Sequence, residues 1–121
     1  MIHIDIFRNK DGNIFGLRVH GHSGTAERGQ DIVCAGISSL AQAAILGICE
    51  HLHRDVDGYV DPSGDLQLKL NGAPDDLTQA VFETVHLGFA AIVRANPNAV
   101  RMRCYRKAFQ KKVHTPGGEN K

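Results

Sequence analysis

Apolar and polar residues alternate along several short segments of the chain. Residues 2–6 and 15–20 both do so, which is the period-two pattern of a half-buried strand. An Asp-Gly turn lies between them, so we expect a hairpin. Residues 57–61 and 66–70 flank a Pro-Ser-Gly turn in the same way and predict a second hairpin.

The spacing changes from period two to helical after Asp31. Apolar residues then recur at every third or fourth position, as on one face of a helix. We expect one long helix over roughly 32–53, with Asp31 as its N-cap. Gly36 and Gly47 lie inside it, and each costs about 1 kcal/mol relative to Ala. A packing or a functional reason is expected to keep them.

A second helix is predicted between Pro74 and Asn96. Proline and two acids suit a helix start, and Asn96-Pro97 ends the apolar stripe. Residues 100–104 alternate again and predict a fifth strand. The order β-β-α-β-β-α-β favours a two-layer α+β domain over residues 1–106, with two helices on one face of a mainly antiparallel sheet. Residues 107–121 are polar, and we expect a flexible tail.

Composition limits the function classes. The chain has 121 residues, 42% hydrophobic and 22% charged, with a net charge of +1, which indicates one globular domain and no general binder of polyanions. Residues 101–112 nevertheless carry six Lys and Arg and no acid. This run is interpreted either as an RNA-binding patch or as a solvated edge and tail.

The cysteine count and the N-terminus bear on the compartment. Three cysteines are present, and an odd number argues against a disulfide framework. The strand pattern begins at once, which leaves no room for a signal peptide. No apolar run approaches the roughly 20 residues of a membrane span. We therefore expect reduced thiols, a cytoplasmic protein and no membrane partner.

The stretch 20–39, HGHSGTAERGQDIVCAGISS, carries the candidate chemistry. With Asp31 as cap, Cys34 is the third residue of the predicted helix, where free N–H groups and the helix dipole favour a thiolate. Those N–H groups would also suit an oxyanion. A histidine nearby would complete a nucleophile and base pair. His22 is the better candidate because it begins the loop, whereas His20 still belongs to the strand.

Structural roles stand beside these chemical ones. Cys34 could be a small buried hydrophobe, and Cys49 and Cys104 are expected to be core residues. Asp31 could be only a cap instead of a third catalytic member. Ser38, one turn beyond Cys34, could support the site or bond back to the preceding turn.

A metal site is the rival chemistry. His20, His22 and Cys34 are suitable ligand types for zinc. The chain has no Cys-x-x-Cys or His-Glu-x-x-His spacing, and no fourth ligand is evident. We expect neither a metal nor a cofactor.

Gly21-His22-Ser23, followed by Gly29-x-Asp31-Ile32-Val33-Cys34-Ala35 and Ile37-Ser38, closely resembles the signature of the ribosomal-processing cysteine protease family, Prp. The resemblance implies a small cytoplasmic bacterial endopeptidase, usually a homodimer. Such an enzyme trims a short N-terminal extension from a large-subunit ribosomal protein. It further implies that Cys34 is the nucleophile and His22 the general base, with Asp31 and Ser38 associated with the site. The loop 23–30 matches a segment that rearranges over substrate.

Two other functions remain open from the residues. One is a non-catalytic ribosome-assembly or RNA-associated module that uses the basic residues 101–112, with binding that weakens steeply with salt. The other is a redox-sensing thiol at Cys34, modified reversibly by peroxide without peptide turnover.

Overall fold

The computed structural model describes residues 1–21 and 28–106, and of residues 28–31 the backbone alone. Its elements are β1 (Ile2–Arg8), β2 (Ile14–His20), α1 (Arg28–Leu46), the π-helical turn η1 (Gly47–His51), β3 (Val56–Val60), β4 (Leu66–Leu70), α2 (Asp76–Ala95) and β5 (Val100–Arg106). The order confirms the predicted one.

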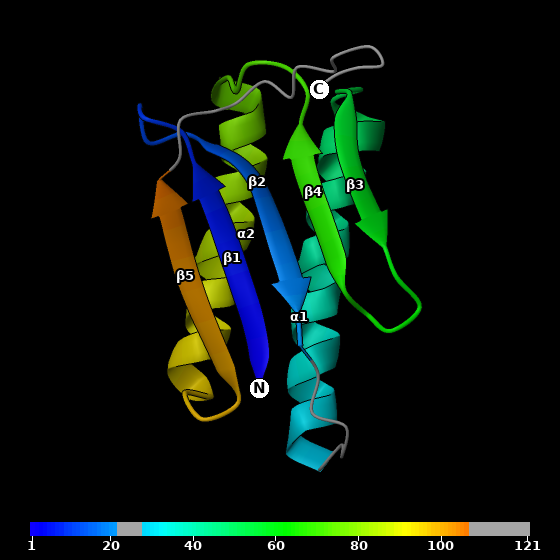
Figure 1. Cartoon of the computed structure of the whole chain (residues 1–121), viewed down its shortest axis with the longest axis vertical. Coiled ribbons are helices and arrows are strands. Elements are labelled where there is room, and N and C mark those ends of the chain that lie inside the picture. Colours follow the sequence, from blue (N-terminus) through cyan, green and yellow to red (C-terminus); the bar gives the residue numbers. More distant parts are fainter. Residues whose placement is uncertain (22–27, 107–121) are drawn as a thin grey trace, which may run out of the picture.

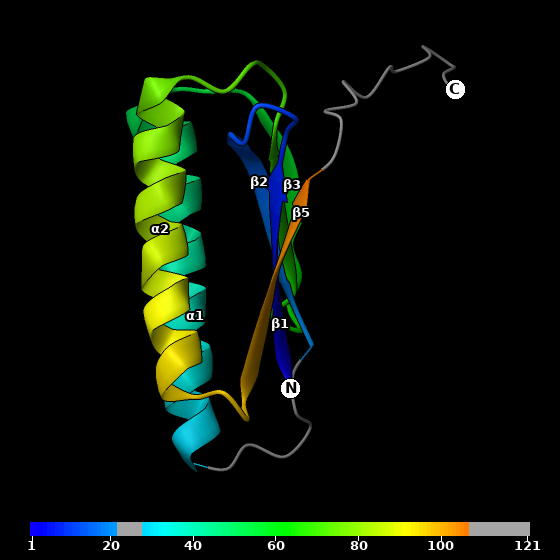
Figure 2. The same ribbon diagram turned by 90° about the vertical axis from the view of Figure 1, so that its left-hand side faces the viewer.

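The strands form one five-stranded sheet in the order β3-β4-β2-β1-β5. Both helices lie on one side of it (Figures 1 and 2). Three of the strand pairs are antiparallel, and β1 pairs with β5 in parallel. The predicted two-layer α+β architecture with a mainly antiparallel sheet is confirmed.

The core fills the space between the sheet and the helices. Alternating apolar residues of β1, β2 and β4 face it, and Ile4, Leu17 and Leu68 are at most 2% exposed. Phe82 and Phe89 of α2 are buried against them. The residues that alternate with these apolar ones on β1 and β2, such as His3 and His20, therefore point to the sheet face away from the helices. We call this side of the sheet the open face.

Glycines let the two helices approach closely. A Cβ at Gly47 would lie 3.1 Å from Val81, and one at Gly36 would lie 3.4 Å from Ile92, both on α2. The packing reason expected for these two glycines is confirmed.

The predicted helix starts need two corrections. In α2 the N-cap is Asp75, which exchanges capping-box hydrogen bonds with Thr78, so Pro74 precedes the helix. In α1 the helix begins at Arg28, and Asp31 is an internal residue, not the N-cap. Arg and Gln are good helix formers, so the residues before Asp31 continue the helix towards the N-terminus.

The segment Ile32–His51 has the length and hydropathy of a membrane span, with a mean hydropathy of 2.0. This contradicts the sequence-based expectation that no segment of the chain does. In this fold Ile37, Ala41, Ala44 and Ile48 of the segment are buried in the domain core. Core packing therefore accounts for one apolar face of the segment.

Candidate functional site

The chain turns sharply where β2 ends. Gly21 follows His20 and has a φ of +80°, a conformation that glycine adopts without strain. A Cβ at this position would lie 2.8 Å from the carbonyl oxygen of Met1. The Gly21 N–H donates to the Asp65 carboxylate at 3.2 Å. These contacts fix the direction in which the chain leaves the sheet towards residue 22.

His20 is held on the open face. Its Nε2 lies 2.9 Å from Asp5 Oδ2, and its ring stacks on His3 with centroids 5.3 Å apart. Because α1 packs on the other face of the sheet, His20 does not face Cys34. His22, the predicted base, lies outside the described residues.

Cys34 is half-buried and packs against the hydrophobic core. It is the seventh residue of α1, not the third of the helix as predicted. An α-helical N–H bonds the carbonyl four residues earlier, so the Cys34 amide is paired within the helix. The amides without such partners belong to the first turn, about 6–9 Å earlier along the axis. The expected oxyanion role of amides beside Cys34 therefore fails for this helix.

Asp31 and Ser38 lie within one turn of Cys34 on α1. Residues three or four apart on a helix share a face, so the backbone brings the three positions together. Ser38 is half-buried, and the side chain of Asp31 is outside the described part of the chain.

The other two thiols lie away from Cys34. Cys49 is half-buried in η1, and burial, followed by the charges of Glu50 and Asp55, raises its pKa. Cys104 is exposed on β5, so its predicted core role is wrong. The reason is its place on an edge strand, where α2 covers it only in part.

Cys104 belongs to a cluster of polar side chains that the sequence did not reveal. Its Sγ lies 3.9 Å from His86 Nε2, and His86 Nδ1 lies 3.5 Å from Glu83. Glu83 in turn accepts two hydrogen bonds from Arg8, at 2.8 and 3.2 Å. The i, i+3 spacing of Glu83 and His86 is visible in the sequence, but their meeting with β1 and β5 is a tertiary contact.

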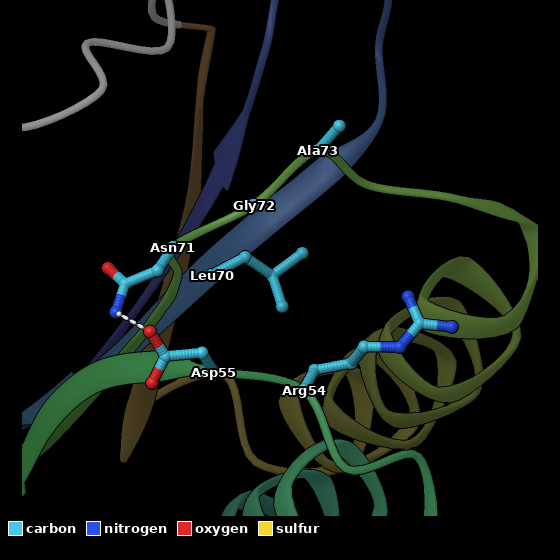
Figure 3. Close-up of a pocket in the computed structure, with 6 residues that line it drawn as sticks. All are labelled: Arg54, Asp55, Leu70, Asn71, Gly72 and Ala73. Atoms are coloured by element: carbon cyan, nitrogen blue, oxygen red, sulfur yellow. Dashed lines mark hydrogen bonds between the residues drawn. The ribbon is translucent and has the colours of Figure 1, made fainter.

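Two further features bear on metal and ligand binding. Among the described side chains, those of residues 1–21 and 32–106, no three from His, Cys, Asp or Glu gather closely enough to hold a metal ion. A shallow hollow of about 230 Å³ lies where β4 leads towards α2, lined by Arg54, Asp55 and residues 70–73 (Figure 3). Asn71 and Asp55 are hydrogen bonded across it. It lies beyond η1, so the part of α1 that follows Cys34, about 18 Å of helix, and all of η1 come between Cys34 and the hollow.

Comparison with known proteins covers nearly the whole domain. The model of the family described as "Cysteine protease Prp" matches residues 1–101. A Staphylococcus aureus protein named "Ribosomal processing cysteine protease Prp" is 28% identical over 105 residues, which is 84% of this chain and 97% of that protein. The Bacillus subtilis protein of the same name is 40% identical over 45 residues, 37% of this chain and 40% of that protein.

Solved structures share the fold. The crystal structure of SMU.848 from Streptococcus mutans has a TM-score of 0.78 and 26% identity, covering 88% of this chain and 96% of that one. A structure of Prp from S. aureus in complex with a substrate peptide has a TM-score of 0.74 and 23% identity, covering 87% and 100% of the two chains.

Proposed function

The chain belongs to the Prp family of cysteine proteases, whose model spans residues 1–101, and from that membership we propose that it removes a short N-terminal extension from a large-subunit ribosomal protein. The family match is the observation that carries the proposal, because it includes both His22 and Cys34. The S. aureus relative is named for ribosomal processing, and one of its structures holds a covalently linked product peptide. A covalent product is what acyl transfer to a thiol yields.

The proposed reaction is acyl transfer through a Cys34 and His22 pair. His22 takes the Sγ proton of Cys34, and the thiolate attacks the scissile carbonyl carbon. The C–N bond breaks, and the imidazolium returns its proton to the leaving amine. Water then loses a proton to His22 and attacks the thioester, which releases the carboxylate product and restores the thiol. Asp31 and Ser38 are proposed as supporting residues on the same helix face.

Peptide cleavage tests the pair. The substrate is a peptide that spans the junction between the extension and the mature ribosomal protein, and turnover is followed by mass spectrometry. Cys34→Ala is expected to abolish cleavage. His22→Ala is expected to reduce kcat on the order of 10²–10⁴-fold, since a positioned acid-base group contributes that much.

Matched variants make the test specific. His20→Ala removes the other histidine of this stretch, which pairs with Asp5, and Cys104→Ala removes a thiol on β5. Both should retain turnover. Cleavage by Cys34→Ala or His22→Ala at the wild-type rate would refute the proposed mechanism.

The remaining parts of the proposal follow from the resemblance. We propose that the enzyme is cytoplasmic, acts as a homodimer and uses neither a metal nor a cofactor. Retention of activity after treatment with EDTA is the expected result for the last point, and loss of activity that zinc restores would contradict it.

A further inference from the structure

The open face of the sheet has a hollow built by three strands. It is about 290 Å³ in volume and is lined by His3, Asp5, Arg18, His20, Arg103 and Tyr105. We call these six residues the basic hollow. One molecule of liquid water occupies about 30 Å³. The hollow therefore has room for a phosphate group with several waters.

The register of the strands explains why these side chains meet. Asp5 on β1 lies opposite Arg18 on β2 and beside Arg103 on β5. His3 likewise lies between His20 and Arg101. Side chains directly across from one another share a face of the sheet, so two rows of three residues cross β2, β1 and β5.

The charge of the basic hollow is unbalanced. Its one carboxylate, Asp5, is only 8% exposed and is paired with His20. No ion pair of Arg18 or Arg103 occurs among the residues that the structure describes. The nearby cations also act on His3, because burial first, and then His20 and Arg103, lower its pKa. The hollow therefore holds two guanidinium groups and one carboxylate, and that carboxylate is already bonded to His20.

Arg18 carries the most specific sign of a missing partner. Its Nε is buried and has no hydrogen-bond acceptor within the described part of the chain. A buried N–H without an acceptor loses its hydrogen bonds to water and gains none in return, which destabilises the fold. An oxyanion in the hollow would remove that penalty, and guanidinium groups match phosphate oxygens in geometry and charge.

The surrounding surface favours a chain of phosphates over a single anion. Arg101 and Arg103 are both exposed on the edge strand β5, and side chains two residues apart on a strand repeat about every 6.6 Å. The rings of His3 and His20 and of Tyr105 lie in the same hollow, and aromatic rings on an open sheet are platforms for unpaired bases.

We propose that the basic hollow, with Arg101 at its rim, binds single-stranded RNA through its phosphate backbone. This face is opposite the helix that carries Cys34 (Figure 2), so RNA and a peptide substrate would occupy different sides of the domain. The sequence suggested the basic run 101–112 as an RNA patch. The structure assigns only part of that run to this face and adds residues from β1 and β2.

The test measures binding of a fluorescein-labelled single-stranded RNA to the full chain by fluorescence anisotropy over a salt series. Three phosphate contacts predict that the logarithm of the association constant falls with the logarithm of salt with a slope of about −2. Arg103→Gln and Arg18→Gln are each expected to weaken binding about tenfold and to reduce the slope by about 0.7. Arg101→Gln, on the exposed edge, is expected to have the same effect on affinity and slope. It leaves the six residues of the hollow unchanged.

Two controls separate the hollow from general attraction. Arg94→Gln removes an exposed arginine on α2 and should leave RNA affinity unchanged. A combined Lys107→Gln, Lys111→Gln and Lys112→Gln variant tests the basic residues that follow β5. If these lysines account for the binding and Arg18 and Arg103 do not, the proposal is overturned.

The choice of RNA is tested by competition. Unlabelled RNA should displace the probe at a concentration at least tenfold lower than polyglutamate of equal charge. Equal competition by the acidic peptide would show a surface for acidic proteins, and equal losses in Arg94→Gln and Arg103→Gln would show attraction by net charge alone. Either result overturns the proposal.

Discussion

Cys49 and Cys104 differ in what surrounds their sulfur atoms. Burial and two nearby carboxylates raise the pKa of Cys49, so less of the reactive thiolate forms near neutral pH. Cys104 is exposed, with its Sγ 3.9 Å from His86 Nε2, so reagents in solvent reach it directly.

Alkylation should therefore distinguish the thiols. With iodoacetamide near neutral pH, Cys104 is expected to react faster than Cys49, as followed peptide by peptide in a mass spectrometer. Labelling of Cys49 before Cys104 would contradict this assignment of their environments.

His3 makes stability depend on pH. Its pKa is lowered from 6.5 in the folded protein, chiefly by burial and then by His20 and Arg103. The unfolded chain thus binds a proton more readily, and stability falls as the pH drops below about 6.5. His3→Gln should lose less in melting temperature between about pH 7 and pH 5 than the wild type. Parallel losses in the two proteins would exclude His3 as a cause.

At the scale of elements, close backbone approach limits what the sheet tolerates. A Cβ at Gly16 in β2 would lie 2.6 Å from the carbonyl oxygen of Leu68 in β4. Since this oxygen belongs to the neighbouring strand, the two strands would have to separate. Gly16 therefore has a packing role, as glycines within strands commonly do.

Gly16→Ala is expected to lower the free energy of unfolding by about 1–3 kcal/mol, the usual cost of overpacking. Gly72→Ala is the matched control, because no atom lies within 4 Å of its added Cβ. Its effect should stay within about 0.5 kcal/mol. Urea unfolding of the two variants measures the difference, and equal effects would refute the steric explanation.

The elements themselves were largely predictable because each alternating or helical pattern is local. The start of α1 was not, since Asp31 is a good N-cap residue and yet Arg28 already lies in the helix. Strand order depends on pairing between distant residues, which leaves no periodic signal. The basic hollow was missed for the same reason, because Arg18 and Arg103 meet only once β1 lies between them.

The candidate catalytic pair was found by another route. Helix position suggested a reactive Cys34 on the premise that Asp31 capped the helix, and that premise is wrong. The resemblance of residues 21–38 to a family signature identified the family, and the match over residues 1–101 confirms that membership. The roles of His22 and Cys34 stay predictions.

At the scale of the whole molecule, the proposed homodimer requires a contact surface between its two subunits. Leu46 of α1 is 53% exposed and Leu87 of α2 is 68% exposed, and we propose that both residues belong to the contact between the two subunits. Light scattering after size exclusion should give twice the chain mass of 13.2 kDa.

The variant with both Leu46→Glu and Leu87→Glu is expected to have the mass of one chain, because buried unpaired carboxylates oppose association. Gln67→Glu, on β4 and the open face, is the control and should remain a dimer. A wild type with the mass of a single chain would contradict the proposed homodimer.

The parallel pair of β1 and β5 sets the time at which the domain can be completed during synthesis. Ile2 pairs with Val100 and Arg8 with Arg106. One edge of β1 therefore stays unpaired until β5, the last strand of the domain, has been synthesised. At typical translation rates this interval is roughly 5–20 s. Throughout it, β1 has one free edge beside the core residues Ile2, Ile4 and Ile6, and free edges recruit other chains. A nascent chain released before β5 should therefore aggregate, not form a smaller working domain.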